Sequence, residues 1–316
     1  MKSLDYQLTG RFHGKRVAVL LGGPSAEREV SFNTGRAMAQ ALRARPYEVI
    51  EIDPGHDLPA RLVAERIDVV LNALHGTWGE DGRLQGLLDW MAIPYTGDGL
   101  RACLLSMDKK LSKELFRLAG VPVAADVVWT RGGAGHALAA LPFGVPLVVK
   151  PVAEGSSVGV TIVRSEGTFA PALAAAFGVS RAVLIEQFVA GPELSVVTLG
   201  DRTLGSVEIE PAREFYDYEA KYGQAGTRYH IPPRLDPEVR AAAEAAGLGA
   251  HLALGCRGVT RTDVIVGAAG PIVLEVNTLP GMTATSLVPK VAAAAGLPFA
   301  DLLELMLDRA TCGLEG

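Results

Sequence analysis

Cysteine, long apolar runs and surplus positive charge are all scarce in this 316-residue chain. Its three cysteines are widely spaced and form no CxxC motif, which argues against a disulfide framework and against a zinc site. No stretch is long and apolar enough to span a bilayer, and the N-terminus lacks the apolar core of a signal peptide. The formal net charge of −5 offers no general basis for binding nucleic acid. We therefore expect a cytoplasmic enzyme with neither a membrane nor a nucleic-acid partner.

Two familiar nucleotide-binding fingerprints are also missing. GxGxxG does not follow the first predicted strand, 16–21, and GxxxxGK[ST] is absent, which disfavours a nicotinamide-dependent oxidoreductase and a P-loop protein. That strand nevertheless ends in Gly22-Gly23 before a helix-starting stretch, the usual shape of a phosphate-binding turn. Glu27 and Glu29 lie where a phosphate would bind, so the turn has the wrong charge for a nucleotide.

Apolar residues make up 49% of the chain and charged residues 21%, which is enough hydrophobic material for a large globular core. Apolar runs predict buried strands at 16–21, 47–52 and 67–72, and helical stretches near 32–44 and 82–92 separate or follow them. This alternation predicts a small α/β domain with a parallel sheet.

The rest of the chain is predicted to be α+β because its strands follow one another as hairpins. We expect a helix that starts at Ser106 and stops at Gly120 to open the second unit. A polar and aromatic stretch at 212–233 has neither helical nor strand periodicity, which is typical of a mobile active-site loop. The predicted domains are 1–104, 105–190 and 191–316.

The segment VTRTDVIVGAAGPIVLEVNT predicts a hairpin with strands at 259–266 and 271–278. A symmetric turn places Asp263 opposite Glu275 and Arg261 opposite Asn277, all on one face. The opposite, core-facing side then carries the apolar residues at 264, 266, 272, 274 and 276. Two facing carboxylates repel each other unless a cation compensates them. Mg²⁺ suits such oxygen ligands, but Arg261 alone can also neutralise the pair, and the pattern leaves both hypotheses open.

Three further residues are candidate binding groups, each with a simpler explanation. Lys150 ends a predicted strand and precedes the loop AEGSSVG, whose backbone N–H groups can close on phosphate oxygens, although such loops are common hairpin connections. Lys109 by itself is explained as a solvated helix lysine. His75 follows a strand of the first domain, at the edge where parallel sheets bind ligands, but its position alone slightly favours a structural role.

Taken together and in order, these pieces resemble the ATP-grasp superfamily and, within it, the D-alanine–D-alanine ligase family. Single motifs are weak, whereas nine in sequence with these spacings are highly specific, and they run through nearly the whole chain. The motifs are LLGGPSAEREVS, LHGTWGEDG, YTGDG, SMDK, VVKPVAEGSSVGV, LIEQF-x-x-GPE, EFYDYEAKY, TRTDVIV and LEVNTLPGMTATSLVP. The resemblance implies three α/β or α+β domains, with ATP held between the central and C-terminal ones.

The resemblance implies that two D-alanines are joined through a D-alanyl phosphate and a tetrahedral intermediate. It assigns the ATP phosphates to Lys109 and Lys150, beneath the loop 154–159. Two Mg²⁺ ions, which Mn²⁺ can replace, would be held by Asp263, Glu275 and Asn277. The other implied ATP contacts are Glu154, Ser157, Glu186, Gln187, Val189 and Glu193. Gln187 stands where some relatives have lysine.

On the D-alanine side, the resemblance implies that Glu27 binds the ammonium of the first substrate. Arg261 and the backbone N–H of Gly281 would bind the oxyanion of the tetrahedral intermediate. The mobile loop would exclude water, with Tyr222 hydrogen-bonded to Ser156 and Glu27. The other implied substrate contacts are His75, Tyr216, Lys221, Ser286 and Leu287. Simple packing is the alternative for the tyrosines, although their period-two spacing in so polar a stretch disfavours it.

The resemblance also implies a homodimer and a role in peptidoglycan precursor synthesis. Two alternatives share the fold: a ligase that makes D-alanyl-D-lactate, and a non-catalytic ATP-binding relative. The sequence EFYDYEAKY disfavours the first, because depsipeptide ligases lack that type of loop. The presence of Lys150, Asp263, Glu275 and Asn277 disfavours the second.

Overall fold

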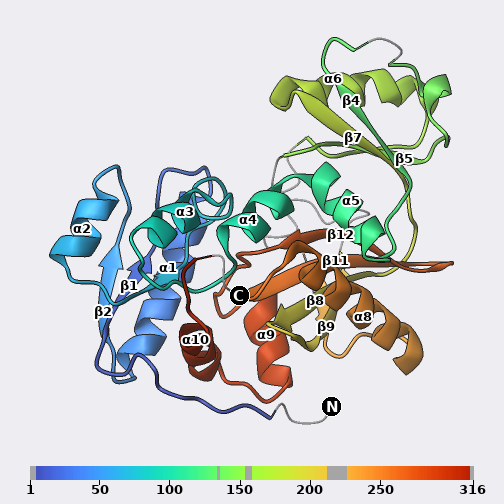
Figure 1. Cartoon of the computed structure of the whole chain (residues 1–316). Helices are drawn as coiled ribbons and strands as arrows, with labels where there is room; N and C mark the ends of the chain where they lie inside the picture. Colours follow the sequence, from blue (N-terminus) through green and yellow to red (C-terminus); the bar gives the residue numbers. More distant parts are fainter. Residues whose placement is uncertain (1–4, 134–135, 154–158, 212–225, 314–316) are drawn as a thin grey trace.

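Three separate sheets organise the chain, which the computed structural model describes over residues 5–133, 136–153, 159–211 and 226–313 (Figure 1). The N-terminal sheet has the order β2-β1-β3 with all strands parallel. Its elements are β1 (Arg16–Leu20), α1 (Arg28–Arg43), β2 (Glu48–Ile52), α2 (Leu58–Ala64), β3 (Val69–Asn72) and α3 (Arg83–Trp90). The predicted parallel α/β unit is confirmed.

The central strand of this sheet is buried on both faces, as expected for a parallel sheet. Val17 and Val19 pack with residues of α1, whereas Ala18 and Leu20 pack with residues of α2 and α3. Helices therefore cover both faces, and the polar residues that follow β1 and β3 meet at one edge.

The middle of the chain forms an antiparallel sheet of order β4-β7-β5-β6. Its strands are β4 (Asp126–Thr130), β5 (Leu147–Pro151), β6 (Thr161–Val163) and β7 (Ala182–Gln187), and α6 (Phe169–Val179) packs on it. Val149 and Ile185 pack in the cluster that includes α6. Lys150 and Glu186, each one position further along, therefore point to the other face. The predicted hairpin-rich α+β pattern is confirmed here.

The C-terminal sheet has the order β10-β9-β8-β11-β12, and all of its neighbouring strands are antiparallel. Its strands are β8 (Glu193–Leu199), β9 (Arg202–Glu210), β10 (Arg228–His230), β11 (Val259–Gly267) and β12 (Gly270–Asn277). The accompanying helices are α8 (Pro237–Leu254), α9 (Leu287–Ala294) and α10 (Phe299–Asp308). β10 lies inside 212–233, so part of that predicted loop is a strand paired with β9. Within the described ranges, no helix is long and apolar enough to cross a bilayer.

Two helices, α4 (Leu100–Met107) and α5 (Lys109–Leu118), lie between the sheets (Figure 1). Phe116 of α5 shares a buried cluster with Val196 of β8 and Ala250 of α8. Hydrophobic packing thus joins α5, which falls in the predicted range 105–190, to the C-terminal sheet. The three domain ranges remain a prediction, although each sheet lies within one of them.

Two local expectations were wrong. A helix does not begin at Ser106; instead α5 begins after Asp108, whose Oδ1 accepts a hydrogen bond from the Leu111 N–H at 3.0 Å. In the hairpin, a β-bulge after Asp263 shifts the register, so that Val273 is buried in the core where Leu274 was expected.

Candidate active site

The hairpin of β11 and β12 has the predicted register at its polar end. Asp263 pairs with Glu275 and Arg261 with Asn277, so all four side chains share one face. Asp263 is 5% exposed, whereas the Glu275 side chain retains 35% exposure. One carboxylate is thus fixed within the fold and the other faces an accessible space.

Two cations from different elements compensate these facing carboxylates. The Arg261 guanidinium donates two hydrogen bonds to Asp263, from Nε to Oδ1 and from Nη2 to Oδ2, both at 2.9 Å. Ser195 Oγ donates another to Asp263 Oδ1 at 2.7 Å. Lys109 Nζ lies 3.4 Å from Glu275 Oε2. Arg261 therefore binds Asp263, and Lys109 of α5 supplies a cation beside Glu275.

The oxygen atoms of this face fit a magnesium site. Asp263 and Glu275 present carboxylates from adjacent strands, and the Asn277 side chain adds an amide oxygen, which accepts a hydrogen bond from the Leu279 N–H at 2.9 Å. Mg²⁺ prefers such hard oxygen ligands and completes its coordination with water and substrate phosphates. Because Lys109 adjoins Glu275, a bound phosphate would meet both the lysine and the metal ligands.

A buried row of charges occupies the face of the central sheet opposite α6. Lys150 Nζ lies 2.5 Å from Glu186 Oε2, and Lys113 binds the other oxygen of the same carboxylate. Burial would raise the pKa of Glu186, but the two ammonium groups outweigh it and hold the pKa below its usual value. Burial lowers the pKa of Lys113 to about 8, against the opposing effect of Glu186.

The glycine turn after β1 does not present its N–H groups to a ligand. Gly22 N–H donates to Ser31 Oγ at 2.8 Å, and Gly23 N–H donates to Asp53 Oδ1 at 2.9 Å. Gly22 and Gly23 have φ angles of 84° and 73°, which favour glycine. The donors that would hold a phosphate are thus used within the fold, in agreement with the predicted mismatch.

Two carboxylates and an imidazole gather beside that turn instead. A carboxylate oxygen of Glu27, a ring nitrogen of His75 and a carboxylate oxygen of Glu80 all lie within 4.8 Å of one another. His75 Nε2 lies 2.9 Å from Thr34 Oγ1, and His75 Nδ1 lies 3.5 Å from Glu80 Oε1. The negative charge of this cluster suits an ammonium group or a metal cation and repels phosphate.

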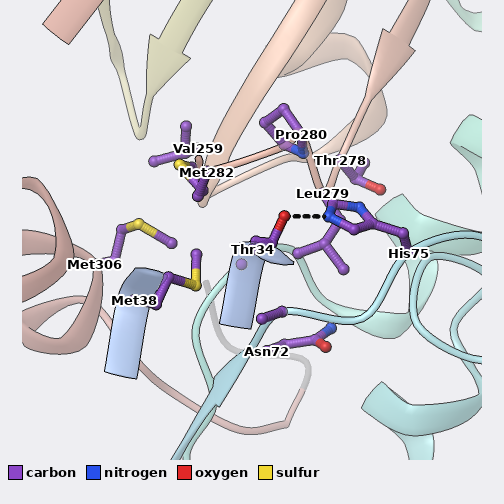
Figure 2. Close-up of a pocket in the computed structure, with 12 residues that line it drawn as sticks. Thr34, Met38, Asn72, His75, Val259, Thr278, Leu279, Pro280, Met282 and Met306 are labelled. Atoms are coloured by element: carbon purple, nitrogen blue, oxygen red, sulfur yellow. Dashed lines mark hydrogen bonds between the residues drawn. The ribbon is translucent and has the colours of Figure 1, made fainter. Parts of the chain in front are cut away.

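The loop after β12 lies near His75 of this cluster (Figure 2). His75 and Thr34 face Thr278, Leu279 and Pro280 across a cavity of about 10 Å³, room for about one water molecule. The N-terminal sheet and the C-terminal hairpin therefore meet where the predicted substrate residues lie.

The same loop continues to the start of α9. A Cβ at Gly281 would lie only 3.0 Å from Ser286 Oγ, so glycine permits this close approach. Ser286 directly precedes α9, and Leu287 is its buried first residue. The N-terminal N–H groups of a helix favour a negatively charged ligand, which suits a carboxylate at this point.

The remaining predicted contacts are only partly described. Gln187 is exposed at the end of β7, Val189 approaches Gly267 at the hairpin turn, and Glu193 begins β8. Six predicted residues lie outside the described residues, namely Glu154, Ser156, Ser157, Tyr216, Lys221 and Tyr222.

Sequence reasoning missed Lys113, Glu80 and Ser195, which all contact predicted site residues. The spacing of Lys113, four residues after Lys109 on one helix, is a signal that could have drawn attention to it. Glu80 follows His75 in the quoted stretch LHGTWGEDG, but no periodicity there predicts which side chains converge.

Comparisons with known proteins show the family of this chain. The family described as D-ala D-ala ligase C-terminus matches residues 115–308, and that described as D-ala D-ala ligase N-terminus matches residues 56–98. A D-alanine–D-alanine ligase of Anaeromyxobacter dehalogenans (strain 2CP-C) is 53% identical over 300 residues, covering 94% of this chain and 97% of the relative.

Two solved structures are also similar. The D-alanine–D-alanine ligase of Bacillus anthracis complexed with ATP is 33% identical, with a TM-score of 0.82 over 93% of this chain and 96% of that one. The VanG D-Ala:D-Ser ligase of Enterococcus faecalis is 28% identical, with a TM-score of 0.81 over 93% of this chain and 99% of that one. The chain therefore belongs to the D-alanine–D-alanine ligase family.

Proposed function

We propose that this chain uses ATP to join two D-alanines into D-alanyl-D-alanine, a precursor for peptidoglycan. The observation that carries the proposal is the polar hairpin face, where Arg261, Asp263, Glu275 and Asn277 lie together beside Lys109. Such a face supplies both metal-binding oxygens and cations for a transferring phosphoryl group. The ligase relatives at about half identity support the same activity.

The first step makes an acyl phosphate. A carboxylate oxygen of the first D-alanine attacks the γ-phosphorus of ATP, and the bond to the β–γ bridging oxygen breaks to release ADP. Lys109 and Lys150 would hold the phosphates, and Glu27 would hold the substrate ammonium. Mg²⁺ bound by Asp263, Glu275 and Asn277 would offset the negative charge of the reacting phosphates.

In the second step, the amine of the second D-alanine attacks the acyl carbon. The tetrahedral intermediate then expels phosphate, and the amine loses a proton. Arg261 and the Gly281 N–H would donate to the oxyanion, and Ser286 at the start of α9 would bind the carboxylate of the second substrate. The contacts assigned to Ser156, Tyr216, Lys221 and Tyr222 remain predictions.

A phosphate-release assay tests the activity. Purified protein with ATP and Mg²⁺ should release phosphate and form dipeptide when D-alanine is added, but not without an acceptor. Parallel reactions in which D-serine or D-lactate competes with D-alanine identify the second substrate. No phosphate release with D-alanine would contradict the proposal. If the dominant product near neutral pH were D-alanyl-D-serine or the ester D-alanyl-D-lactate, the chain would be a ligase with a different second substrate.

We further propose that the chain forms a homodimer through α4 and the adjoining start of α5. Leu100, Leu104 and Leu111 are 37%, 56% and 40% exposed, and the first two share a helix face at i and i+4 spacing. Leu104→Lys should shift the mass measured by light scattering from dimer to monomer. Val63→Lys, a change at an even more exposed apolar position on α2, should leave the dimer intact. A monomeric wild-type protein would contradict this proposal.

A further inference from the structure

Lys113 is buried and lies outside every predicted contact with substrate or ATP. It projects from α5 with an exposed fraction of 1% and binds Glu186 Oε1, while its Nζ lies 3.4 Å from Asp126 Oδ1. Asp126 and Glu186 are directly paired across β4 and β7, so their carboxylates share one face and repel each other. Lys113 lies between them and offsets that repulsion.

Two further cations complete the row at its ends. Arg117, one helical turn after Lys113, binds Asp126, and Lys150 binds the second oxygen of Glu186. The three cations and two carboxylates leave one surplus positive charge. Asp126 has Lys113 and Arg117 as cationic partners, and Glu186 has Lys113 and Lys150. Each carboxylate therefore keeps one partner if the other leaves.

This redundancy matters at Lys150, because the proposed function requires that lysine to hold ATP phosphates. A shift of its ammonium group toward the phosphates weakens its contact with Glu186, which is only 4% exposed. A buried carboxylate that loses its partner is strongly destabilised. When Lys150 binds phosphate, Lys113 keeps its own ion pair with Glu186, so the buried carboxylate still has a cationic partner.

We propose that Lys113 is a positioning residue that holds Glu186 and so releases Lys150 to bind the phosphates of ATP. This inference rests on the proposed function. Without Lys113, the buried Glu186 would retain Lys150 as its main partner, and ATP would have to compete with that ion pair. The loss should therefore affect binding of phosphates more than binding of adenosine.

The test compares the affinities of Lys113→Met and wild type for ATP and adenosine, by titration and by competition. Lys113→Met should raise the ATP Kd roughly 10-fold, as expected for one weakened charge-assisted contact, and change the adenosine Ki less than about 3-fold. Lys110→Met, an exposed change on the same helix, is the matched control and should leave both constants unchanged. Thermal melts confirm that each variant is folded.

Removal of the carboxylate charge gives a comparison that separates a positioning role from a merely structural one. Glu186→Gln alone measures the loss of the ATP contact that Glu186 itself is predicted to make. In Lys113→Met/Glu186→Gln, Lys150 has no buried Glu186 charge to neutralise, so adding Lys113→Met to Glu186→Gln should cause no further loss of ATP affinity. Lys113→Gln should reproduce the weakened ATP binding if the methionine variant does not fold. An unchanged ATP Kd in Lys113→Met, an equal loss for adenosine, or a further loss of roughly 10-fold when Lys113→Met is added to Glu186→Gln would overturn the inference alone. A wild-type protein that does not bind ATP would overturn the proposed function as well.

Discussion

Replacing Arg261 with methionine should lower kcat for ligation by about 10²- to 10³-fold, the usual cost of losing one preorganised donor to an oxyanion. The guanidinium is held by two hydrogen bonds to Asp263, so its orientation is set before substrate binds. Arg261→Lys keeps the charge but loses the planar fork, and should recover only part of the rate. Initial rates of phosphate release at saturating ATP and D-alanine measure the effect.

The magnesium dependence of that rate separates two explanations. Removing Arg261 also deprives Asp263 of a partner, which could weaken metal binding. If Arg261 acts on the oxyanion, kcat stays low when Mg²⁺ is raised to saturation, and the half-saturating Mg²⁺ concentration changes little. Arg202→Met, at an exposed position on β9, is the control for loss of an arginine. A folded Arg261→Met protein with kcat within about 5-fold of wild type would contradict the assigned role.

The polar hairpin face was predictable because strand periodicity fixes it. A period of two and a short turn place Asp263 opposite Glu275 with few alternatives, since a one-residue slip would bury the charges. The bulge that brings Val273 into the core could not be read from the sequence. Val273 and Leu274 are both apolar, and only packing against α8 and β8 decides which one is buried.

The start of α5 is a second feature that the sequence alone could not predict. Ser106 and Asp108 are both good N-cap residues, and the sequence does not decide between them. In the fold, Ser106 Oγ donates to the Cys103 carbonyl within α4, which leaves Asp108 to cap the next helix. This break fixes where Lys109 and Lys113 project, so the buried charge row depends on a local choice that only tertiary structure settles.

Only part of the buried charge row could be identified from the sequence. The local pattern singled out Lys150 and the resemblance added Glu186, but nothing in the local pattern pairs them with Lys113 and Asp126. Residues distant in sequence meet there because α5 packs against one face of two separate strands. Charges that meet only through tertiary packing leave no periodic signal, which is why motif reasoning predicted ligand contacts for Lys150 and Glu186 but did not identify Lys113 and Asp126.

Glu27→Gln should raise the D-alanine concentration needed for half-maximal rate by roughly 10- to 100-fold and leave the ATP Kd unchanged. Loss of one charged hydrogen bond to an ammonium group costs about 1.5–3 kcal/mol, which corresponds to that range. Glu27 shares its cluster with His75 and Glu80, so some negative charge remains and activity should be reduced rather than abolished. Steady-state kinetics and ATP titration measure the two constants.

Glu29→Gln provides the matched control, since Glu29 is exposed in the first turn of α1 and lies outside the three-residue cluster. It should change neither constant. The opposite result for Glu27→Gln is a raised ATP Kd with unchanged dependence on D-alanine. That result would contradict the assignment of Glu27 to the substrate ammonium and would indicate that the glycine turn binds nucleotide. The structure argues against that result, because Ser31 and Asp53 already accept the hydrogen bonds of Gly22 and Gly23. A turn whose donors are satisfied within the fold can position a carboxylate for an ammonium ion but has no free N–H at these two positions for a phosphate.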